Sequence, residues 1–550
     1  MATTALPSSL EIGQRATLRP IEEVAAELGL RPDEVELYGR FKAKISPAAV
    51  DRLADRPLGK LVAVTSVTPT KAGEGKTTTA VGLVEGLGAL GRRPILCLRE
   101  PSLGPVFGIK GGGAGGGRAQ VAPMEDLNLH FTGDLHAIGA ANNLLAAMLE
   151  AHLLHGNRLG IDPLSVVWRR CVDMDDRALR SVVVGLGGSA NGHPRETGFD
   201  ITAASEVMAI VAVARDLGDL RRRLGGITVA YTREGAAVTA EELGAAGSMT
   251  VLLKDALKPN LIQTLEGEAA LVHCGPFANI AHGNNSLLAD LLALRLGDYV
   301  VTEGGFGSDM GFEKFCDIVC RVGRLRPSAV VLVATVQALR SHGAGSIEAG
   351  AENLARHLAV VRQFGLDPVV AVNRFPGDTD ADVEAVRDAA LVLGAGRVAA
   401  CNAFARGGAG ATELAQAVVE AADQPSEFAP LYPLAAPLRT KIEAIATRIY
   451  GAAGVDFAPA ALAALDRLER DGLGELPVCM AKTHLSLSHD PALGANPKDF
   501  TLPVRDLRPF TGAGWVVALC GRMQTMPGLP ATPAAFQIDV DETGRTVGLY

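Results

Sequence analysis

The segment TPTKAGEGKTTT, residues 68–79, follows a short apolar run and opens an expected helix. Residues 61–67 (LVAVTSV) have the β-branched, apolar character of a buried strand. Residues 78–90 carry apolar side chains near helical spacing. A strand, a glycine-containing loop and a helix in this order are typical of a phosphate-binding loop.

Within this loop each polar group has a chemical reason to be present. Gly73 and Gly75 let backbone N–H groups curl around phosphate oxygens, and Lys76 adds a full positive charge at the helix start. Thr77 is then placed to hold Mg²⁺. The usual pattern, G-x-x-x-x-G-K-[ST], has glycine where this chain has Thr70, so the match is incomplete. A glycine-rich turn without nucleotide is the alternative.

The composition is that of a globular protein of the α/β class. The chain has 550 residues, and the usual ~100–200 residues per domain suggests about three domains. Hydrophobic residues make up 48% and aromatic residues only 4% of the chain, with 63 glycines. Such a composition favours helices and parallel strands over an aromatic-rich β-sandwich.

Charge and cysteine content argue against several classes of protein. The net charge of −9, with one short basic run, argues against a nucleic-acid-binding surface. The apolar runs at residues 207–214 and 329–334 are too short to span a bilayer, and no signal peptide is evident. Eight scattered cysteines indicate reduced thiols rather than a disulfide framework or a zinc site. We therefore expect a cytoplasmic protein that binds neither membranes nor nucleic acid.

Strand-like runs alternate with helical ones over residues 61–365. These runs are residues 61–67, 94–98, 181–186, 227–230, 299–302 and 329–334. The alternation predicts a parallel sheet covered by helices, in which ligands gather at the carboxyl ends of the strands. Before it, residues 1–60 form an amphipathic lead-in, where ELGLRPDEVELYGRFKAKI indicates a helix pair broken at Pro32.

The chain is expected to divide into three domains. Residues 1–365 would form a large P-loop-type domain with a mostly parallel sheet. Residues 366–455 contain another strand, VVAVNRF, and a helix near residues 379–393, and would form a smaller α/β domain. Residues 456–550 contain turns and the short strands PVCMAK, WVVALCGRM and AFQIDV, and would form a small α+β module.

A second candidate loop follows the strand at residues 94–98. It begins with Arg99, whose planar guanidinium can hold a carboxylate or phosphate through two hydrogen bonds. Six of the seven residues 111–117 are glycine, which frees backbone N–H groups to line an anionic ligand. A flexible linker is the alternative, but such linkers are usually padded with serine, whereas charged residues and histidines bound this loop. We predict a site-forming loop.

Two further loops follow strand-like runs and carry polar groups. His273 and His282 lie in HCGPFANIAHGNNS, where no plausible set of metal ligands is completed nearby, so hydrogen bonding is the favoured role. Glu303 and Asp309 lie among glycines in VTEGGFGSDMGFEKF. These carboxylates could help to place a cation or could cap helices, and the sequence leaves both roles open.

Two phenylalanines in loops are the aromatic candidates. Phe375 in NRFPGDTD and Phe404 in NAFARGGAG follow strand-like runs and do not fall at core spacing. Flat rings in such places could sandwich a planar heterocycle, although loop packing is the commoner role of a phenylalanine.

Taken together, these motifs resemble those of the formate–tetrahydrofolate ligase family. The resemblance covers about residues 45–550, and ten motifs occur in family order. They are TPTKAGEGKTTT, REPSLGPVFGIKGG, PMEDLNLHFTGD, FDITAASEVMAI, GPFANIAHG, VTEGGFGSDMG, ATVQALR, NRFPGDTD, AKTHLSLS and TMPGLP. The family's phosphate loop has the Thr70 variant, which accounts for the mismatch noted above.

The resemblance implies an activity and its cofactors. The family uses ATP to convert formate into enzyme-bound formyl phosphate, and a folate nitrogen then attacks the formyl carbon to give 10-formyltetrahydrofolate. Formate is a poor electrophile, so conversion to a mixed anhydride supplies the leaving group that it lacks. The resemblance also implies Mg²⁺, a monovalent cation (K⁺ or NH₄⁺) and assembly into a homotetramer.

Site residues are carried over at positions that match the family's motifs. Lys76 would stabilise the transferred phosphoryl group and Arg99 would orient formate, with Glu100 and Asp134 close to the intermediate. Phe375 and Phe404 match loops that hold the pterin ring. The expected binding residues are Thr70, Gly73, Glu74, Gly75, Lys76, Thr77, Thr78, Ser102, Phe375, Pro376 and Phe404, with Mg²⁺ on Thr77.

The chain departs from the family's pattern at several positions. Arg118 stands where tyrosine is common and adds a positive charge beside the proposed anion site. Phe404 stands where tryptophan is common, which keeps a flat face but loses the larger indole, so we expect weaker folate binding. His484 and His489 stand where other polar residues are expected in AKTHLSLSHD.

Two functions of other classes fit parts of the sequence. KAGEGKT approaches the K-G-G-x-G-K-[ST] loop of partner-switching ATPases, but Ala72 replaces its first glycine and the distal motifs are left unexplained. A family member that has lost catalysis and serves as a scaffold is the second alternative. The intact Lys76, Thr77 and Arg99 argue against it.

Overall fold

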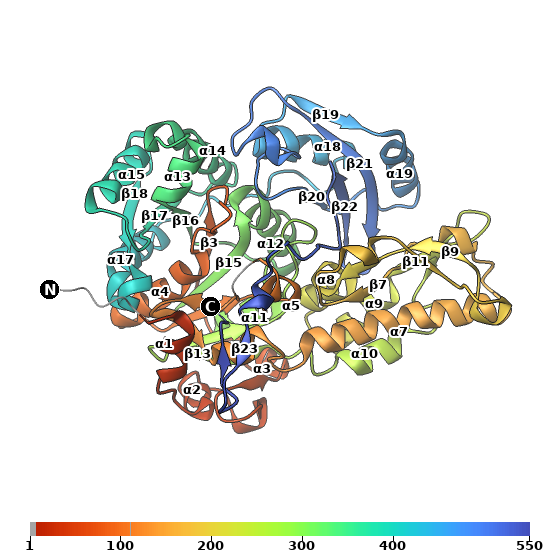
Figure 1. Cartoon of the computed structure of the whole chain (residues 1–550), viewed down its shortest axis with the longest axis horizontal. Coiled ribbons are helices and arrows are strands. Elements are labelled where there is room, and N and C mark those ends of the chain that lie inside the picture. The colour runs from red at the N-terminus through yellow and green to blue at the C-terminus, as the bar shows by residue number, and fades with distance from the viewer. Residues whose placement is uncertain (1–6, 110–111, 550) are drawn as a thin grey trace.

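The centre of the molecule is a sheet of twelve strands (Figure 1), seen in a computed structural model that describes residues 7–109 and 112–549. Neighbouring strands follow the order β1-β2-β13-β14-β4-β15-β3-β16-β17-β18, and β5 and β6 pair off this path. The strands are β1 (Val35–Leu37), β2 (Ala43–Ile45), β3 (Lys60–Ser66), β4 (Pro94–Leu98), β5 (Gly115–Gly116), β6 (Ala119–Ala122), β13 (Asn260–Thr264), β14 (Ala269–Val272), β15 (Tyr299–Gly307), β16 (Ala329–Ala334), β17 (Val369–Asn373) and β18 (Arg397–Cys401).

From β14 to β18 every pair of neighbours is parallel, as the alternation of strands and helices predicts. The central strand β3 shows why these runs are apolar throughout. Leu61 and Ala63 pack into one hydrophobic core, whereas Val62 and Val64 pack into another. Both faces of the strand are therefore buried, which confirms the predicted α/β fold.

Helices cover both faces of the sheet. On one face α4 (Lys76–Ala89) and α17 (Thr412–Ala422) share a core with β3 and β16. On the other face lie α11 (Leu287–Leu296), α13 (Val336–His342), α14 (Ile347–Arg362) and α15 (Asp380–Val392). Helix α15 begins at a capping box of Thr379 and Asp382, which explains its sharp start close to the predicted position.

A separate lobe lies between β6 and β13 in the sequence and occupies the lower right of Figure 1. Its helices α7 (Asp134–Leu154), α8 (Glu206–Val213), α9 (Leu217–Gly225) and α10 (Ala246–Leu253) build a core of their own. Small sheets flank them: β7 (Arg170–Val172) with β10 (Phe199–Ile201), β8 (Val182–Val184) with β9 (Arg195–Thr197), and β11 (Thr228–Tyr231) with β12 (Ala237–Thr239).

The placement of two strand-like runs, residues 181–186 and 227–230, in the large sheet was wrong. They form β8 and β11, each of which pairs antiparallel with the strand that follows it. Only a loop with the short 3₁₀ turn Ser189–Asn191 separates β8 from β9, and only a short loop separates β11 from β12, so the chain returns beside itself in both places. Both runs therefore lie in two-stranded sheets outside the large one.

The predicted helix pair at residues 27–45 was also wrong. Helix α2 (Ile21–Glu27) ends before Pro32, and the segment after it forms the hairpin of β1 and β2. Strand β2 is wholly buried and pairs antiparallel with β13. Residues 43–45 form a strand despite the local helical pattern, because a short apolar segment takes the conformation that buries it, here by pairing with β13.

The C-terminal part forms a second sheet in the order β19-β21-β22-β20. Its elements are α18 (Leu438–Ala444), β19 (Gly454–Phe457), α19 (Pro459–Arg470), β20 (Val478–Ala481), β21 (Thr501–Phe510) and β22 (Trp515–Cys520). The strands expected in PVCMAK and WVVALCGRM are present, whereas AFQIDV forms only the short β23 (Asp539–Val540), which pairs with β24 (Thr546–Val547). A boundary at residue 365 falls between β16 and β17 of one sheet, and the three-domain division stays a prediction.

Helix α7 is the one described helix with the length and apolarity of a membrane span. Its residues Ile138, Leu145 and Leu149 pack into the core of the lobe. All eight cysteines are free, and each is buried. Shorter helices are α1 (Ser9–Arg15), α3 (Ala48–Arg52), α5 (Leu103–Phe107), α6 (Met124–Asn128), α12 (Cys320–Gly323) and α16 (Ala403–Arg406), with π-helical turns at Ser308–Phe312, Phe315–Val319 and Ile445–Tyr450.

Candidate functional site

Seven loops meet at one edge of the large sheet, because parallel strands end on the same side. They follow β3, β4, β14, β15, β16, β17 and β18. Lys76 follows β3 and Arg99 follows β4, and only β15 lies between these two strands. The predicted phosphate loop and the predicted anion clamp therefore lie close together at this edge.

The loop between β3 and α4 has a backbone suited to phosphate. Gly73 and Gly75 have φ angles of 79° and 65°, in the left-handed region that glycine tolerates. A Cβ atom at Gly75 would overlap the side-chain amide of Asn373, so no larger residue fits. Lys76 begins α4, whose first N–H groups carry a partial positive charge, and Thr78 is buried in the first turn.

Glu74 stabilises this loop through hydrogen bonds of its carboxylate and its carbonyl. Its buried carboxylate accepts hydrogen bonds from the Thr70 N–H (2.7 Å) and the Thr335 hydroxyl (2.5 Å). Its carbonyl accepts one from the Asn373 amide (3.0 Å). The Thr70 hydroxyl is buried and has no hydrogen-bond partner in the described part of the chain. Glu74 is therefore placed to shape the loop, with its carboxylate already engaged.

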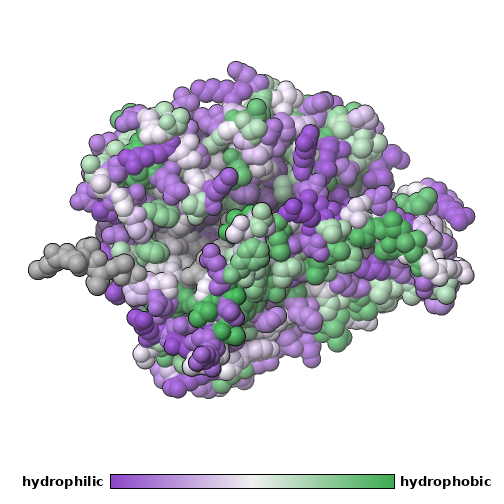
Figure 2. All heavy atoms as spheres, viewed as in Figure 1, coloured by the Kyte–Doolittle hydropathy of each residue, from purple (hydrophilic) through white to green (hydrophobic). Residues whose placement is uncertain are grey.

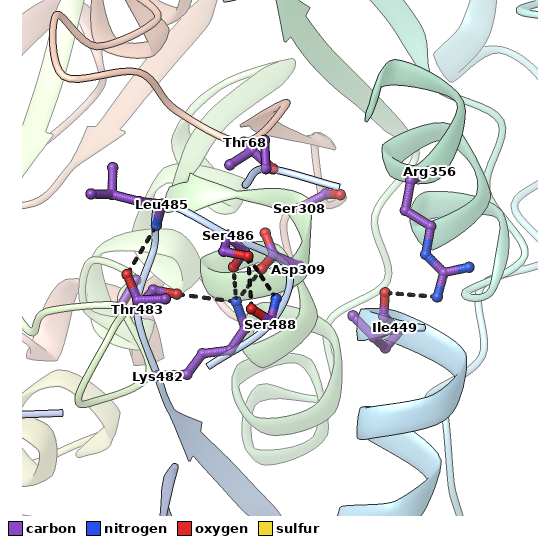
Figure 3. Close-up of polar contacts among 12 residues, drawn as sticks. Thr68, Ser308, Asp309, Arg356, Ile449, Lys482, Thr483, Leu485, Ser486 and Ser488 are labelled. Carbon is purple, nitrogen blue, oxygen red and sulfur yellow. Dashed lines mark hydrogen bonds and ion pairs between the residues drawn. The ribbon is translucent and has the colours of Figure 1, made fainter. Parts of the chain in front are cut away.

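A buried polar network supports the entrance of the loop, and Figure 3 labels two of its members, Thr68 and Ser308. The Thr68 hydroxyl lies 2.9 Å from His357 Nε2 and accepts a hydrogen bond from Asn353 (3.0 Å). The Thr68 carbonyl lies 2.7 Å from His342 Nε2. The second ring nitrogen of His357 lies 2.7 Å from the Ser308 hydroxyl. Burial lowers the pKa of His357 to about 4, so a neutral ring bridges the two hydroxyls.

Asp309 is bound from the C-terminal sheet (Figure 3). Lys482, directly after β20, donates a hydrogen bond to the Asp309 carboxylate at 2.7 Å, and both side chains are buried. Lys482 also donates to the carbonyls of Thr483 and Ser486. This ion pair joins the C-terminal sheet to the π-helical turn at Ser308–Phe312, and it occupies one of the two carboxylates whose role the sequence left open.

The other carboxylate, Glu303, lies at the centre of the edge with Lys76 and Arg99. Burial lowers the pKa of Lys76, with a smaller contribution from Arg99, and Glu303 opposes the shift. Burial also lowers the pKa of Arg99, again against Glu303. Arg99 Nη1 donates to the Pro276 carbonyl (3.1 Å), while its buried Nε has no partner within the described residues. Two cations beside one carboxylate suit an anionic ligand.

Thr77 and Glu303 offer oxygen atoms beside this cluster. The Thr77 hydroxyl donates to the two Glu303 carboxylate oxygens at 3.0 and 3.3 Å. This pair fits Mg²⁺, which takes one or two protein oxygens and completes its shell with water and phosphate oxygens. No three His, Cys, Asp or Glu side chains of the described residues are grouped to hold a metal by themselves.

Beyond Arg99 the chain lines a cavity of about 310 Å³ with Glu100 in its wall. Burial raises the pKa of Glu100 well above its usual range, and the nearby Asp134 raises it further. Glu100 Oε2 has no hydrogen-bond partner among the residues described. The polar lining of the cavity is completed by His130, His136, Asn143, Asp173 and Thr202.

Asp134 and Ser102 have protein partners at this cavity. The Asp134 carboxylate forms a buried ion pair with Lys44 (2.8 Å) and accepts a hydrogen bond from Asn260 (2.8 Å). The Ser102 hydroxyl donates to Asp173 at 2.5 Å. The structure thus brings Glu100 to the cavity and places Asp134 behind it, in contact with the N-terminal hairpin.

Phe375 and Phe404 follow the neighbouring strands β17 and β18. A Cβ atom at Gly75 would lie 3.8 Å from the Phe375 ring, so this ring borders the phosphate loop. Pro376 follows it in an exposed turn. A Cβ atom at Gly116 would lie 3.2 Å from the Phe404 ring, so that ring borders the glycine-rich loop. Both rings are half-buried.

The two histidines of the loop after β14 differ in their contacts. His273 Nδ1 lies 2.6 Å from the Ser286 hydroxyl and Nε2 lies 2.7 Å from the Ala256 carbonyl, as expected for hydrogen bonding. The ring nitrogens of His282 have no hydrogen-bond partner in the described residues, so hydrogen bonding of this ring to a substrate stays a prediction. His282 packs edge-on against Trp515, with ring centroids 5.2 Å apart.

Several residues at this edge were not identified as site residues from the sequence. Thr335 and Asn373 support the phosphate loop from the ends of β16 and β17, and Lys44 pairs with Asp134 from the segment assigned to a lead-in. The position directly after a buried strand was the available signal for Thr335. The Arg118 N–H donates to the Phe404 carbonyl at 2.9 Å, and His484 stacks on Phe306 with ring centroids 4.1 Å apart.

Comparison with known proteins decides the family. The sequence profile described as formate–tetrahydrofolate ligase matches residues 7–550. The chain belongs to the formate–tetrahydrofolate ligase family. Formate–tetrahydrofolate ligases from Roseiflexus sp., Desulforamulus reducens and Saccharopolyspora erythraea are 57%, 55% and 55% identical to it. These matches cover 98%, 99% and 99% of the chain and 100% of each relative. Membership of this ligase family confirms the resemblance carried by the ten motifs.

Proposed function

We propose that the chain joins formate to tetrahydrofolate through formyl phosphate formed at the cluster of Lys76, Arg99 and Glu303. The overall reaction, ATP-dependent formylation of tetrahydrofolate to 10-formyltetrahydrofolate, ADP and phosphate, is that of a formate–tetrahydrofolate ligase, the family to which the chain belongs. The observation that carries the proposed mechanism is the placement of Lys76 and Arg99 around one carboxylate, at the ends of three adjacent parallel strands.

In the first step a formate oxygen attacks the γ-phosphorus of ATP, and the bond to ADP breaks. Arg99 holds formate, and its Nε is a free donor for a second oxygen. Lys76 and the N–H groups at the start of α4 stabilise the charge on the phosphoryl oxygens. Thr77 and Glu303 would hold Mg²⁺, which would neutralise further charge on the phosphate oxygens.

In the second step a folate nitrogen attacks the formyl carbon and phosphate leaves. Phe375 and Phe404 would hold the pterin ring, because they border the phosphate loop and the glycine-rich loop respectively. Burial raises the pKa of Glu100, which favours a carboxyl group that can donate a hydrogen bond to an oxygen of the intermediate. Asp134 would act indirectly, because Lys44 already occupies its carboxylate.

We also propose a cytoplasmic homotetramer that uses a monovalent cation, K⁺ or NH₄⁺, as the family implies. Exposed apolar side chains on the lobe of α7 to α10 support assembly. Leu164, Leu186 and Val251 are 81%, 63% and 67% exposed, and Figure 2 shows hydrophobic patches among hydrophilic residues over this lobe. Exposed apolar patches are typical of protein interfaces.

Oxygen-labelled formate tests the proposed intermediate. Attack by a formate oxygen on ATP must leave one formate oxygen in the released phosphate, which mass spectrometry of the phosphate detects. Unlabelled phosphate would eliminate formyl phosphate chemistry. A second measurement is ADP release, which we expect to require formate and tetrahydrofolate together; release that continues unchanged without formate would favour a plain ATPase.

A further inference from the structure

The N-terminal helix α1 contacts the glycine-rich loop directly. The Ser9 hydroxyl accepts a hydrogen bond from the Gly117 N–H at 3.0 Å. The Ser9 carbonyl accepts one from the Gln120 amide at 3.0 Å, and the same amide donates to the Gly117 carbonyl at 2.7 Å. Ser9 and Gln120 therefore satisfy both the N–H and the C=O of Gly117. A glycine has no side chain to fix its position, so these bonds set where the loop lies.

The same loop also packs against Phe404. A Cβ atom at Gly116 would lie 3.2 Å from the Phe404 ring and 3.4 Å from the Ser9 hydroxyl, so both residues lie close to this glycine. Gly117 has a φ of 59°, and a Cβ atom there would overlap the Phe404 carbonyl. The Arg118 N–H donates to that carbonyl at 2.9 Å. The glycine wall, residues 116–118, thus contacts both α1 and Phe404.

Helix α1 is itself fixed at its other end. The Gln14 amide donates to the Glu125 carboxylate (2.6 Å) and to the Thr546 carbonyl (3.0 Å), and Arg545 donates to the Gln14 side chain at 3.1 Å. Leu10 is buried in the core beneath α4. Figure 1 shows α1 beside the C-terminal segment at this part of the molecule. Because α1 is held in place, its residue Ser9 holds the glycine wall at a defined position.

We propose that Ser9 is a positioning residue for the folate substrate, acting through the glycine wall on Phe404. The inference rests on the proposed role of Phe404 in holding the pterin ring. Without the Ser9 hydroxyl, the Gly117 N–H loses its partner and the wall is free to move away from the ring. The contacts of Ser9 described above all lie on the folate side, so the steps at Lys76 and Arg99 should be unaffected.

Adjacent serines offer a matched test. Ser8 caps α1, where its hydroxyl accepts a hydrogen bond from the Glu11 N–H at 3.2 Å, whereas Ser9 reaches the loop. Ser9→Ala should raise the KM for tetrahydrofolate about three- to tenfold, the range expected for loss of one neutral hydrogen bond. The kcat and the KM for ATP should change less than about twofold. Ser9→Thr, which keeps a hydroxyl, should restore the wild-type KM, and Ser8→Ala should leave it unchanged.

A measurement without turnover completes the test. Hydrogen exchange of residues 115–121 should be faster in Ser9→Ala than in Ser8→Ala, because only the first removes the partner of the Gly117 N–H. Equal effects of both variants on KM would assign the effect to helix stability and overturn the proposal. An unchanged KM in Ser9→Ala would also overturn it. Phe404→Ala separates the two hypotheses: if it raises KM while Ser9→Ala does not, only the role of Ser9 is wrong, and if neither does, the folate site itself is wrong.

Discussion

The proposed phosphate side and the proposed folate side of the candidate site belong to one sheet edge, yet they are held by different interactions. Around Lys76 the side chains are charged or polar and at least half-buried, with Thr77 bound to Glu303 and the Glu74 carboxylate bound to the loop backbone. Around Phe404 the contacts are a half-buried ring, glycine backbone and single hydrogen bonds.

This difference suits the ligand that we propose for each side. Phosphoryl transfer develops charge at fixed places, and preorganised cations and N–H groups are effective only where their geometry is exact to a fraction of an ångström. A flat heterocycle is bound mainly through its contact area with an aromatic side chain. Replacement of one aromatic side chain by another therefore changes the affinity only slightly. We therefore expect substitutions to have large effects on turnover on the phosphate side and small effects on KM on the folate side.

The largest effect is expected at Lys76. Lys76→Ala removes the cation closest to the phosphate loop, and the rate of ADP formation at saturating substrates should fall about 10²- to 10³-fold. Lys71→Ala is the matched control, because Lys71 lies exposed in the same loop. A comparable loss at Lys71 would favour the partner-switching type of ATP site and weaken the comparison.

A smaller effect is expected at Glu303. Glu303→Gln keeps the shape of the side chain but removes the charge that faces Lys76, Arg99 and the Thr77 hydroxyl. The Mg²⁺ concentration needed for half-maximal activity should rise about 10- to 100-fold, as for other groups that orient a metal site. Glu352→Gln on the exposed surface is the control. An unchanged Mg²⁺ requirement would remove Glu303 from the metal side of the site.

Acid should destabilise the phosphate side through its buried histidine. The pKa of His357 is lowered from 6.5 to about 4 in the folded chain. As the pH falls below 6.5, the unfolded chain takes up a proton that the folded chain does not bind until about pH 4, so stability is full above pH 6.5 and is lost as the pH falls between these values. At pH 5 the loss amounts to roughly 2 kcal/mol.

Urea unfolding at two pH values measures this contribution. Between pH 7 and pH 5, the fall in the free energy of unfolding should be smaller in His357→Gln than in the wild type by roughly 2 kcal/mol, because glutamine can bridge Thr68 and Ser308 without titrating. His155→Gln, at an exposed helix end, should keep the wild-type pH dependence. Identical pH dependence in all three proteins would contradict the assignment.

The smallest effect is expected at Phe404. Phe404→Ala should raise the KM for tetrahydrofolate roughly three- to tenfold with little change in kcat, because aromatic stacking contributes ~0.5–1.5 kcal/mol. Phe404→Trp should lower the KM below that of the wild type, since the larger ring adds contact area. A large fall in kcat in Phe404→Ala would mean that the phosphate side and the folate side have been assigned the wrong way round.

Local signals in the sequence were sufficient for much of the phosphate side. The strand, loop and helix around Lys76 lie in one continuous segment, and β3 and α4 match their expected positions within two residues. Arg99 was found because it directly follows the apolar run of β4. Phe375 and Phe404 were found in the same way, although their assignment to the pterin ring needed the family resemblance and remains to be tested.

Contacts between distant segments could not be predicted in this way. Glu303 was left open between two roles, because its partner Thr77 is more than two hundred residues away. Lys44 was assigned to a helical lead-in, because nothing near it in the sequence indicates that β2 pairs with β13. For β8 and β11, the apolar runs were recognised as strands, but the partner of a strand depends on the turn that follows it.

The amino-acid sequence by itself determined the alternation of strands and helices around the phosphate loop, the residue types at that loop and the family to which the chain belongs. The tertiary structure alone decided that β15 inserts between β3 and β4, which brings Glu303 between Lys76 and Arg99. It also decided that α1 reaches the glycine wall. The reason is that local pattern sets the conformation of a segment, whereas its neighbours are chosen by the burial and pairing of the whole chain.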